Sequence, residues 1–256
     1  MTESADDTRE HCVLITGASS GLGREMALRL STANYALILG GRDAARLQRT
    51  LEDCAHPERH LAWRHDLVDV DGIAAGLEML LATHDVRVAG FVHCAAMLNI
   101  LPLRSLTTAM VRDAFQANVF SSMEIVKTLT KKRVNRQRLR AVVFVSSIAS
   151  QFGAKGFSAY SASKGALDAL MKCLAVELAP EVRVNSVLPG ALHTPMTESM
   201  FDDPGLAHRL EADYPLGIGL PGDVVDAVEF LLSAKARWIT GQQLVIDGGR
   251  TSNITA

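Results

Sequence analysis

The chain has 256 residues, of which 48% are hydrophobic, and its formal net charge is −2. This length and composition suit a single α/β domain with a substantial core and exclude a disordered chain. The small net charge gives no whole-molecule attraction to nucleic acid or to an anionic membrane surface. The basic run KKRVNRQRLR at 131–140 has no interleaved aromatic residues, so we interpret it as the solvated end of a helix. We expect neither nucleic acid nor a membrane as a partner.

Cysteine usage and the N-terminal segment predict where the protein works. The cysteines are widely separated, which favours neither a disulfide framework nor a zinc site, and no metal is expected. They are Cys12, Cys54, Cys94 and Cys173. The first residues, MTESADDTRE, are polar and acidic, so residues 1–10 are expected to be a flexible tail rather than a signal peptide. No apolar run approaches the ~20 residues of a membrane helix, and a cytoplasmic protein is expected.

Apolar runs alternate with helical patterns along the whole chain. We expect strands at 12–16, 36–39, 60–63, 88–94, 141–145, 182–187 and 243–247. We expect helices at 22–33, 43–54, 70–83, 106–134, 158–178 and 222–233. Strands that are apolar on both faces, each followed by a helix, predict a parallel sheet with helices on both faces and right-handed crossovers. The predicted fold is α/β, one doubly wound Rossmann-type domain over 11–256.

Two connections suggest a ligand site. The first strand leads into a glycine-rich turn, LITGASSGLGREMAL, that carries Gly17, Gly21 and Gly23. Glycines let backbone N–H groups approach a diphosphate at a helix N-terminus, although many strand-to-helix corners need glycine only for packing. Its position at the first strand of an alternating α/β chain favours a dinucleotide site. The long irregular stretch at 190–220 is a candidate lid over that site.

The end of the second strand bears on the choice between NADP(H) and NAD(H). An acidic residue there would bind the adenosine ribose of NAD, whereas an arginine accommodates the 2′-phosphate of NADP. The strand ends at the uncharged Gly41, and Arg42 follows. Asp43 competes for the acidic role, but it opens DAARL and is better placed as a helix N-cap. We favour NADP(H); the alternative is that Arg42 is an ordinary surface residue.

A tyrosine and a lysine stand one helical turn apart in SAYSASKGALDAL, at Tyr160 and Lys164. A fixed ammonium stabilises a phenolate, so we expect a lowered pKa that lets Tyr160 act as acid or base. The spacing alone is usually structural, and its companions strengthen the case. Ser147 ends the fifth strand, where a hydroxyl can hold a carbonyl oxygen. Asn118 lies inside a predicted helix although asparagine is a poor helix former, which also suits a buried hydrogen bond or a kink.

Jointly these motifs resemble the short-chain dehydrogenase/reductase family, in its shorter branch, over nearly the whole chain. The resemblance rests on TGASSGLG at 16–23, Asp66 in HDLVD, Asn118, Ser147, YSASK at 160–164, PG at 189–190 and WITGQQLVIDGG near the end. It implies that Tyr160 is the catalytic acid/base, that Ser147 positions the substrate oxygen and that Lys164 binds the nicotinamide ribose. It further implies that Asn118 holds a water linking Lys164 to solvent.

The same resemblance implies a set of cofactor-binding residues, with Asp66 at the adenine and Thr194 at the nicotinamide amide or the diphosphate. The set is Gly17, Ser19, Ser20, Gly21, Leu22, Gly23, Arg42, Asp66, Leu67, Ala95, Tyr160, Lys164, Pro189, Gly190 and Thr194. One departure follows the fourth strand, where the family's N-N-A-G is replaced by His93-Cys94-Ala95-Ala96. We interpret His93 as a strand-end histidine and Cys94 as a buried thiol, because the catalytic set is complete without them. The change is expected to alter local hydrogen bonding more than chemistry.

The family implies an oxidoreductase acting on a carbonyl or secondary alcohol, with 3-oxoacyl thioesters among the candidates, and Arg42 favours NADP(H) as its cofactor. Apolar residues that would surround the substrate, or that belong to the core, are Met97, Leu98, Ile100, Phe152, Met196 and Phe201. The alternatives are a non-catalytic NADP-binding sensor or scaffold and a sugar-modifying enzyme of the extended branch. The family also implies a homodimer or homotetramer, with helices 106–134 and 158–178 pairing across a dyad and the C-terminal motif near a second interface.

Overall fold

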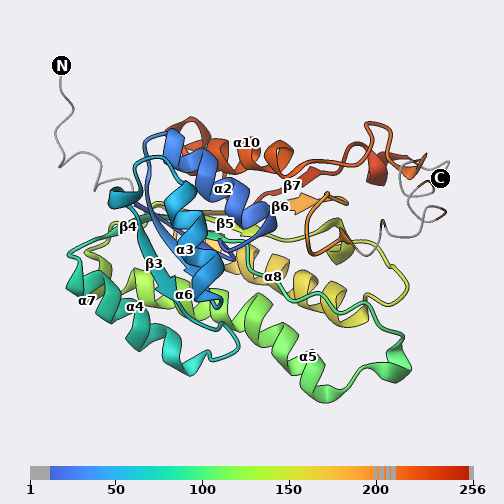
Figure 1. Cartoon of the computed structure of the whole chain (residues 1–256), viewed down its shortest axis with the longest axis horizontal. Helices are drawn as coiled ribbons and strands as arrows, with labels where there is room; N and C mark the ends of the chain where they lie inside the picture. The colour runs from blue at the N-terminus through green and yellow to red at the C-terminus, as the bar shows by residue number, and fades with distance from the viewer. Residues whose placement is uncertain (1–11, 199–200, 202–204, 206–207, 209–211, 254–256) are drawn as a thin grey trace.

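A parallel sheet of seven strands organises the computed structural model, which describes residues 12–198, 201, 205, 208 and 212–253 (Figure 1). The expected tail at 1–10 and part of the expected lid lie outside these residues. The strand order is β3-β2-β1-β4-β5-β6-β7, and every pairing is parallel. The strands are β1 (Cys12–Thr16), β2 (Ala36–Gly41), β3 (Leu61–Arg64), β4 (Val88–His93), β5 (Ala141–Val145), β6 (Arg183–Pro189) and β7 (Gln243–Ile246).

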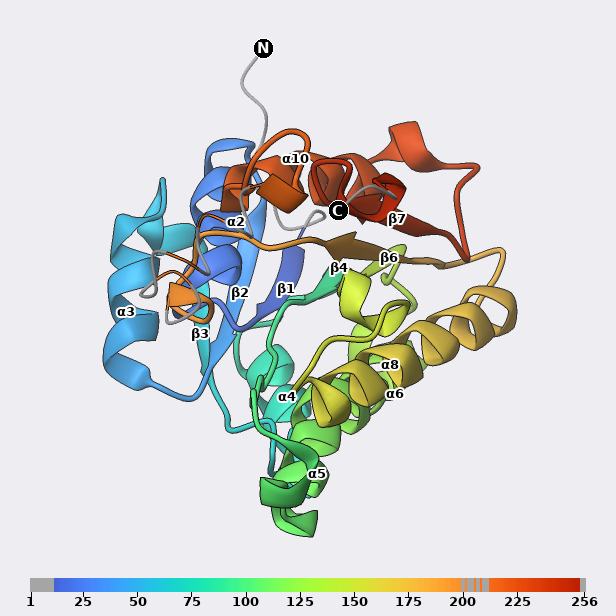
Figure 2. The same cartoon turned by 90° about the vertical axis from the view of Figure 1, so that its right-hand side faces the viewer.

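Helices cover both faces of the sheet, as predicted for a doubly wound fold. One layer contains α2 (Gly21–Thr32), α3 (Ala44–Asp53) and α10 (Pro221–Leu232). The other contains α4 (Asp71–Thr83), α5 (Thr108–Phe115), α6 (Ser121–Thr130), α7 (Lys132–Asn135) and α8 (Ser158–Glu177). Figure 2 shows α2 and α10 on one side of the sheet and α4, α6 and α8 on the other. Short 3₁₀ turns are η2 (Pro57–Arg59), η3 (Leu103–Ser105), η5 (Ile148–Ser150), η7 (Ala234–Ala236) and η8 (Arg250–Ser252).

Each face of the sheet has its own apolar core, and the central strands contribute to both. In β1, Leu14 packs with the layer of α4, α6 and α8, whereas Val13 and Ile15 pack with the layer of α2 and α10. Successive side chains of a strand point to opposite faces, so a strand buried on both sides must be apolar at every position. This requirement explains why the strand positions could be predicted from unbroken apolar runs.

The strand order places a ligand crevice at one edge of the sheet. From β1 the chain proceeds outward to β2 and β3, and from β4 it proceeds outward in the other direction. The connections therefore leave the C-terminal ends of β1 and β4 on opposite sides, and such a switch point opens a crevice between them. In the part of the chain that the structure describes, no helix combines the length and the hydropathy of a membrane span.

The single helix predicted at 106–134 is wrong in its interior. After α5 the chain forms a π-helical turn, η4 (Gln116–Phe120), before α6 begins, and a further break at Lys131 separates α6 from α7. A π turn inserts an extra residue into a helix and occurs mostly as one turn at functional sites. Asn118 lies at its centre and is completely buried. Of the two structural roles expected for this asparagine, the buried hydrogen bond is confirmed, since its amide bonds to Met97 and Ser163.

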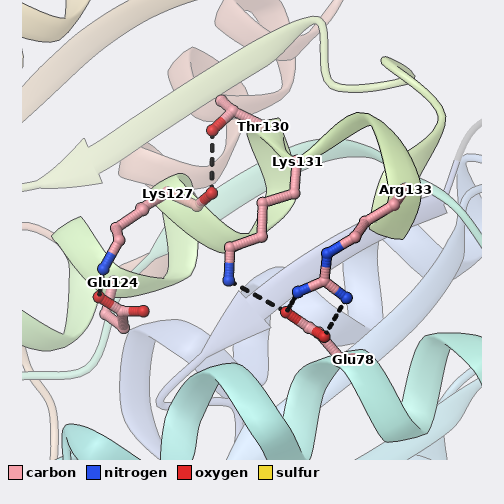
Figure 3. A network of polar contacts seen from close by, with 6 residues as sticks. All are labelled: Glu78, Glu124, Lys127, Thr130, Lys131 and Arg133. Carbon is pink, nitrogen blue, oxygen red and sulfur yellow. Dashed lines mark hydrogen bonds and ion pairs between the residues drawn. The ribbon is translucent and has the colours of Figure 1, made fainter.

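The basic run at 131–140 is engaged by acidic side chains of its own chain (Figure 3). The Lys131 Nζ lies 3.0 Å from a carboxylate oxygen of Glu78 on α4, and both terminal nitrogens of Arg133 lie 2.9 Å from the same carboxylate. These contacts, that of Lys131 first, lower the pKa of Glu78. The run begins directly after α6, contains the short helix α7 and leads into β5, so its interpretation as the end of a helical segment is confirmed.

Candidate active site

The glycine-rich turn between β1 and α2 is too tight for side chains at two of its glycines. A Cβ at Gly23 would lie 2.3 Å from the carbonyl oxygen of Gly17, and a Cβ at Gly17 would lie 2.8 Å from the backbone of Ala95. Gly17 also has a φ of +72°, which side-chain-bearing residues rarely adopt. The turn therefore rests directly on the chain that follows β4. It leads into α2, which begins after Ser20. The first N–H groups of a helix have no partners within the helix and can bind an anion. This cradle fits a dinucleotide diphosphate.

The end of β2 lies beside this turn. A Cβ at Gly41 would lie 3.4 Å from the Ser19 hydroxyl, and the exposed Arg42 follows immediately. The Asp43 carboxylate accepts a hydrogen bond of 3.0 Å from the Arg46 backbone N–H and caps α3, which also lowers the pKa of Asp43. The N-cap interpretation of Asp43 is thus confirmed. Arg42 is the charged side chain that β2 delivers next to the glycine turn.

The remaining predicted cofactor residues lie on loops at the same sheet edge. Asp66 follows β3; it is exposed, and its carboxylate accepts a hydrogen bond of 3.2 Å from the Val68 N–H. Leu67 beside it is half-buried. At the far end of β6, Pro189 is the last strand residue, and a Cβ at Gly190 would lie 2.8 Å from the Tyr214 ring. These positions follow from parallel strands ending at a common edge.

The start of the predicted lid closes back over the glycine turn. A Cβ at Gly21 would lie 3.5 Å from the Cβ of Thr194, so these two segments are in contact. The two ends of the lid meet where Leu192 forms a parallel bridge with Gly219, whose carbonyl accepts a hydrogen bond of 3.1 Å from the His193 N–H. The beginning and the end of this segment are therefore paired with each other, and its beginning lies beside the start of α2.

Tyr160 and Lys164 lie on one face of α8, next to the end of β5. The Lys164 Nζ is 5.6 Å from the centroid of the Tyr160 ring and donates a hydrogen bond of 2.7 Å to the Val145 carbonyl. Lys164 is only 1% exposed. Burial lowers the pKa of Lys164 to about 8, although Cys94 and Asp168 oppose the shift. The ammonium is thus held at the sheet edge by a strand-end carbonyl and has a weakened hold on its proton.

The predicted lowering of the Tyr160 pKa is wrong for this structure. Burial raises the pKa of Tyr160 to about 12, because the phenolate loses its hydration and the neighbouring groups stabilise it less than water would. A hydrogen bond with the Ser147 side chain works in the opposite direction, and Cys94 adds to the rise. The Lys164 ammonium is directed at the Val145 carbonyl. The phenol is consequently protonated at neutral pH, the state that can donate a proton to a carbonyl oxygen.

Ser147 and Asn118 complete the predicted group and occupy different positions in it. Ser147 is half-buried and caps η5, with its Oγ accepting a hydrogen bond of 3.1 Å from the Ala149 N–H. The Asn118 amide makes hydrogen bonds of 2.7 Å and 3.2 Å with the backbone of Met97 and donates a hydrogen bond of 2.9 Å to the Ser163 Oγ. The Asn118 side chain therefore ties the loop after β4 to α8. Both hydrogens of its amide are used within the chain.

Sequence reasoning missed two polar residues that support this group. Ser163 accepts from Asn118 and donates a hydrogen bond of 2.7 Å to the Tyr160 carbonyl. Thr16, at the end of β1, lies 3.0 Å from the ring of His93. A small hydroxyl residue next to Lys164 on the buried helix face was an available signal for Ser163. Cys94, interpreted as a buried thiol, is half-buried, and burial raises the pKa of Cys94 to about 12.

Comparison with known proteins gives a consistent family. A family model described as enoyl-(acyl carrier protein) reductase matches residues 17–251. Cyclopentanol dehydrogenase of Comamonas sp. (strain NCIMB 9872) is 31% identical over 244 residues, covering 94% of this chain and 97% of that relative. L-xylulose reductase of Bos taurus is 32% identical over 238 residues, covering 92% of this chain and 94% of that relative.

Solved structures agree with these relatives. A 4-hydroxyisoleucine dehydrogenase mutant complexed with NADH and succinate superposes with a TM-score of 0.87 at 26% identity, covering 94% of this chain and 99% of that one. A short-chain type dehydrogenase/reductase from Mycobacterium ulcerans gives 0.86 at 30% identity, covering 95% of this chain and 90% of that one. The chain belongs to the short-chain dehydrogenase/reductase family and is an NAD(P)-dependent oxidoreductase.

The depressed Lys164 pKa makes stability depend on pH in a defined direction. Between about 8 and the ordinary value of 10.5, the unfolded chain holds a proton on this lysine that the folded chain has released. Raising the pH through this window therefore favours the folded state. As the pH rises through this range, we expect the free energy of unfolding of the wild type to increase relative to that of Lys164→Met.

This difference is measured by urea unfolding at a series of pH values, with Lys155→Met as the control. Lys155 is exposed in the loop before α8, so its substitution should leave a difference that does not change with pH. A pH-independent difference for Lys164→Met would contradict the assignment of the lowered pKa to Lys164.

Proposed function

We propose that the protein is an NADP(H)-dependent carbonyl reductase and secondary-alcohol dehydrogenase in which Tyr160 transfers the proton. The observation that carries this proposal is the placement of the Tyr160 phenol, with the Lys164 ammonium 5.6 Å from its ring and bound to the end of β5, at the sheet edge that holds the glycine turn. A bound nicotinamide would supply or accept the hydride. The chain itself binds, orients and moves the proton.

Each polar residue has a separate task in this proposal. Tyr160 donates its phenolic proton to the substrate oxygen during reduction and accepts the hydroxyl proton during oxidation. Ser147, whose side chain lies close enough to the phenol to lower its pKa, holds the same substrate oxygen. Lys164 binds the ribose and balances the phenolate when it forms. The backbone around Asn118 holds a water through which the proton exchanges with solvent, because the amide hydrogens of Asn118 are already used.

The cofactor is bound along the whole C-terminal edge of the sheet. The glycine turn and the first turn of α2 hold the diphosphate, Arg42 the 2′-phosphate, Asp66 and Leu67 the adenine, and Thr194 the nicotinamide end. Two observations support this distribution: Gly41 adjoins Ser19, and Gly21 adjoins Thr194. The capping role of Asp43 further supports NADP(H), because that carboxylate is engaged at the start of α3.

Substitution of Arg42 tests the cofactor preference. We expect Arg42→Leu to weaken NADPH binding ~10-fold or more, because a charge-assisted contact with the 2′-phosphate is lost. NADH binding should stay within about twofold, since NADH lacks that phosphate. Both dissociation constants can be measured by titrating cofactor fluorescence. The exposed Arg49 on α3 provides the control, as Arg49→Leu should affect neither. Equal losses for the two cofactors would contradict the role of Arg42.

For the substrate we propose a carbonyl or secondary alcohol carried on an apolar chain or ring, with 3-oxoacyl thioesters as the principal candidates. Large apolar side chains stand exposed on loops after β4, β5 and β6: Ile100 is 41% exposed, Phe152 51% and Met196 46%. Two of these loops are joined by a hydrogen bond of 3.0 Å from the Leu101 N–H to the Gly156 carbonyl. An apolar rim of this kind suits an aliphatic substrate better than a polyol.

Tyr160→Phe tests the catalytic assignment. The variant keeps the ring and its edge contact with Phe157 but loses the transferable proton. We expect carbonyl reduction to fall by ~10²–10⁴-fold, the usual contribution of a general acid, with little change in NADPH affinity. The assay follows NADPH oxidation on a panel containing a 3-oxoacyl thioester, a cyclic ketone and a ketose. Near wild-type rates in the variant would refute the mechanism.

The same panel separates the alternatives. Tight NADPH binding by the wild type without turnover of any carbonyl or alcohol would support a non-catalytic sensor. Turnover restricted to the ketose would overturn the apolar substrate class while leaving the mechanism intact. We also propose a cytoplasmic location, which the described cysteines support: Cys12, Cys54, Cys94 and Cys173 are all free thiols.

We further propose that the protein assembles as a homotetramer through two surfaces. Trp238 is 90% exposed beside the edge strand β7, where Leu244 and Val245 are also exposed. Val176 is 81% exposed near the end of α8, and further apolar side chains are exposed on α5 and α6. Large exposed apolar side chains are typical of interaction surfaces. They agree with pairing of the long helices at one interface and of the C-terminal segment at the other.

We expect Trp238→Glu to convert the tetramer to a dimer, because a carboxylate would be buried at the second interface. The mass is measured by light scattering after size exclusion. Lys235→Glu, a nearby exposed substitution, should leave the assembly unchanged. A wild type that is monomeric at micromolar concentration would contradict the proposal.

A further inference from the structure

A histidine stands in the core at the point where the sheet order reverses. His93 is the last residue of β4, is 0% exposed, and packs edge-on against Phe144 with ring centroids 6.3 Å apart. Its Nδ1 lies 3.0 Å from the Thr16 hydroxyl at the end of β1. Its Nε2 is buried and makes no hydrogen bond among the described residues, and the backbone of Ala117 and Asn118 lies close enough to the ring to affect its pKa. The imidazole thus lies between the glycine turn and the π turn η4.

The surrounding groups fix which nitrogen carries the proton. The Thr16 oxygen accepts a hydrogen bond from the Ala95 N–H at 3.4 Å, and its own hydrogen needs an acceptor. The His93 Nδ1 supplies that acceptor only when it is unprotonated. The backbone of Asn118 and Ala117 favours an N–H on the ring, and Nε2 is the ring nitrogen that Thr16 leaves without a partner. Both arguments place the proton on Nε2.

The ring is also uncharged. Burial, together with the nearby Lys164 ammonium, lowers the pKa of His93 to about 3, and the carbonyls of Asn118 and Ala117 only partly oppose this. The groups that face the ring are the Thr16 hydroxyl from β1, the carbonyls from η4 and the Lys164 ammonium from α8. A second positive charge beside Lys164 would be costly in this buried setting. The imidazole therefore works as a fixed neutral dipole.

We propose that His93 is a positioning residue whose neutral imidazole, protonated on Nε2, joins the cofactor turn to the backbone around Asn118. Thr16 directly precedes Gly17, whose Cα leaves no room for a Cβ against the Ala95 backbone. Asn118 in turn is bonded to Ser163 on the Tyr160 helix. One ring thus aligns the two segments between which the nicotinamide and the proton path would meet. The kinetic consequence rests on the proposed function, whereas the tautomer does not.

The tautomer is tested directly on the wild-type protein by long-range ¹H–¹⁵N correlation of the histidine rings. His93→Asn assigns the His93 signals by their disappearance. We expect Nε2 to carry the proton, with signals that do not change between about pH 5 and pH 8, where an ordinary histidine titrates. Thr16→Val should shift the Nδ1 resonance, because its donor is lost. A proton on Nδ1, or titration within this range, would overturn the proposal.

The positioning role is tested by kinetics in a double-mutant cycle. We expect His93→Leu to lower kcat ~10-fold and to weaken NADPH binding. Adding Thr16→Val to this variant should lower kcat only slightly further, because the two residues act as a unit. His93→Asn, whose amide can both accept and donate, should recover most of the loss. Phe91→Leu is the packing control: it should lower the melting temperature with kcat within about twofold.

Outcomes of the two experiments are separable. Full additivity of Thr16→Val and His93→Leu, or no recovery in a folded His93→Asn, would overturn the positioning role. Absence of any activity in the wild type would refute the proposed function, and the spectra would still decide the tautomer. Should His93→Leu fail to fold, the spectra of the wild type and the kinetics of Thr16→Val still test the proposal.

Discussion

A buried ammonium bound to a strand-end carbonyl is the interaction on which the site depends. The Lys164 Nζ donates to the Val145 carbonyl at the end of β5, and the lysine is almost completely excluded from solvent. Placing a positive charge there is unfavourable in itself, and the lowered pKa of Lys164 expresses that cost. The contact nevertheless fixes α8 against the sheet edge, so that Tyr160, one turn earlier, stands at the same edge. Burying Lys164 thus lowers the stability of the fold but fixes the position of Tyr160 at the sheet edge.

The buried polar residues around this contact form the framework of the site. Asn118 joins the loop after β4 to Ser163 on α8, and His93 joins the end of β4 to Thr16 on β1. These links all cross between segments that converge at the C-terminal edge of the central strands. Polar groups are costly to bury in a core, so their concentration here marks the part of the fold where function, rather than packing, sets the residues.

Much of the fold could be predicted because it depends on local patterns. Strands β1 and β5 were placed to the residue, since a strand buried on both faces is apolar at every position. Asp43 was placed as a cap because its side chain acts on the next helical turn. The helix at 106–134 was wrong for the opposite reason. The π turn around Asn118 depends on contacts with Met97 and Ser163, which are distant in the sequence and invisible to any local pattern.

The pKa of Tyr160 also could not be predicted from local sequence patterns. The spacing of Tyr160 and Lys164 indicated their proximity, but the extent of burial, which raises the phenol pKa, is a property of the assembled core. The raised and the lowered pKa nevertheless fit one mechanism. In the resting site the phenol is neutral and leaves the ammonium to the Val145 carbonyl. In the proposed mechanism a phenolate exists for Lys164 to stabilise only after the proton leaves, and an interaction that strengthens as the reaction proceeds is the kind that accelerates it.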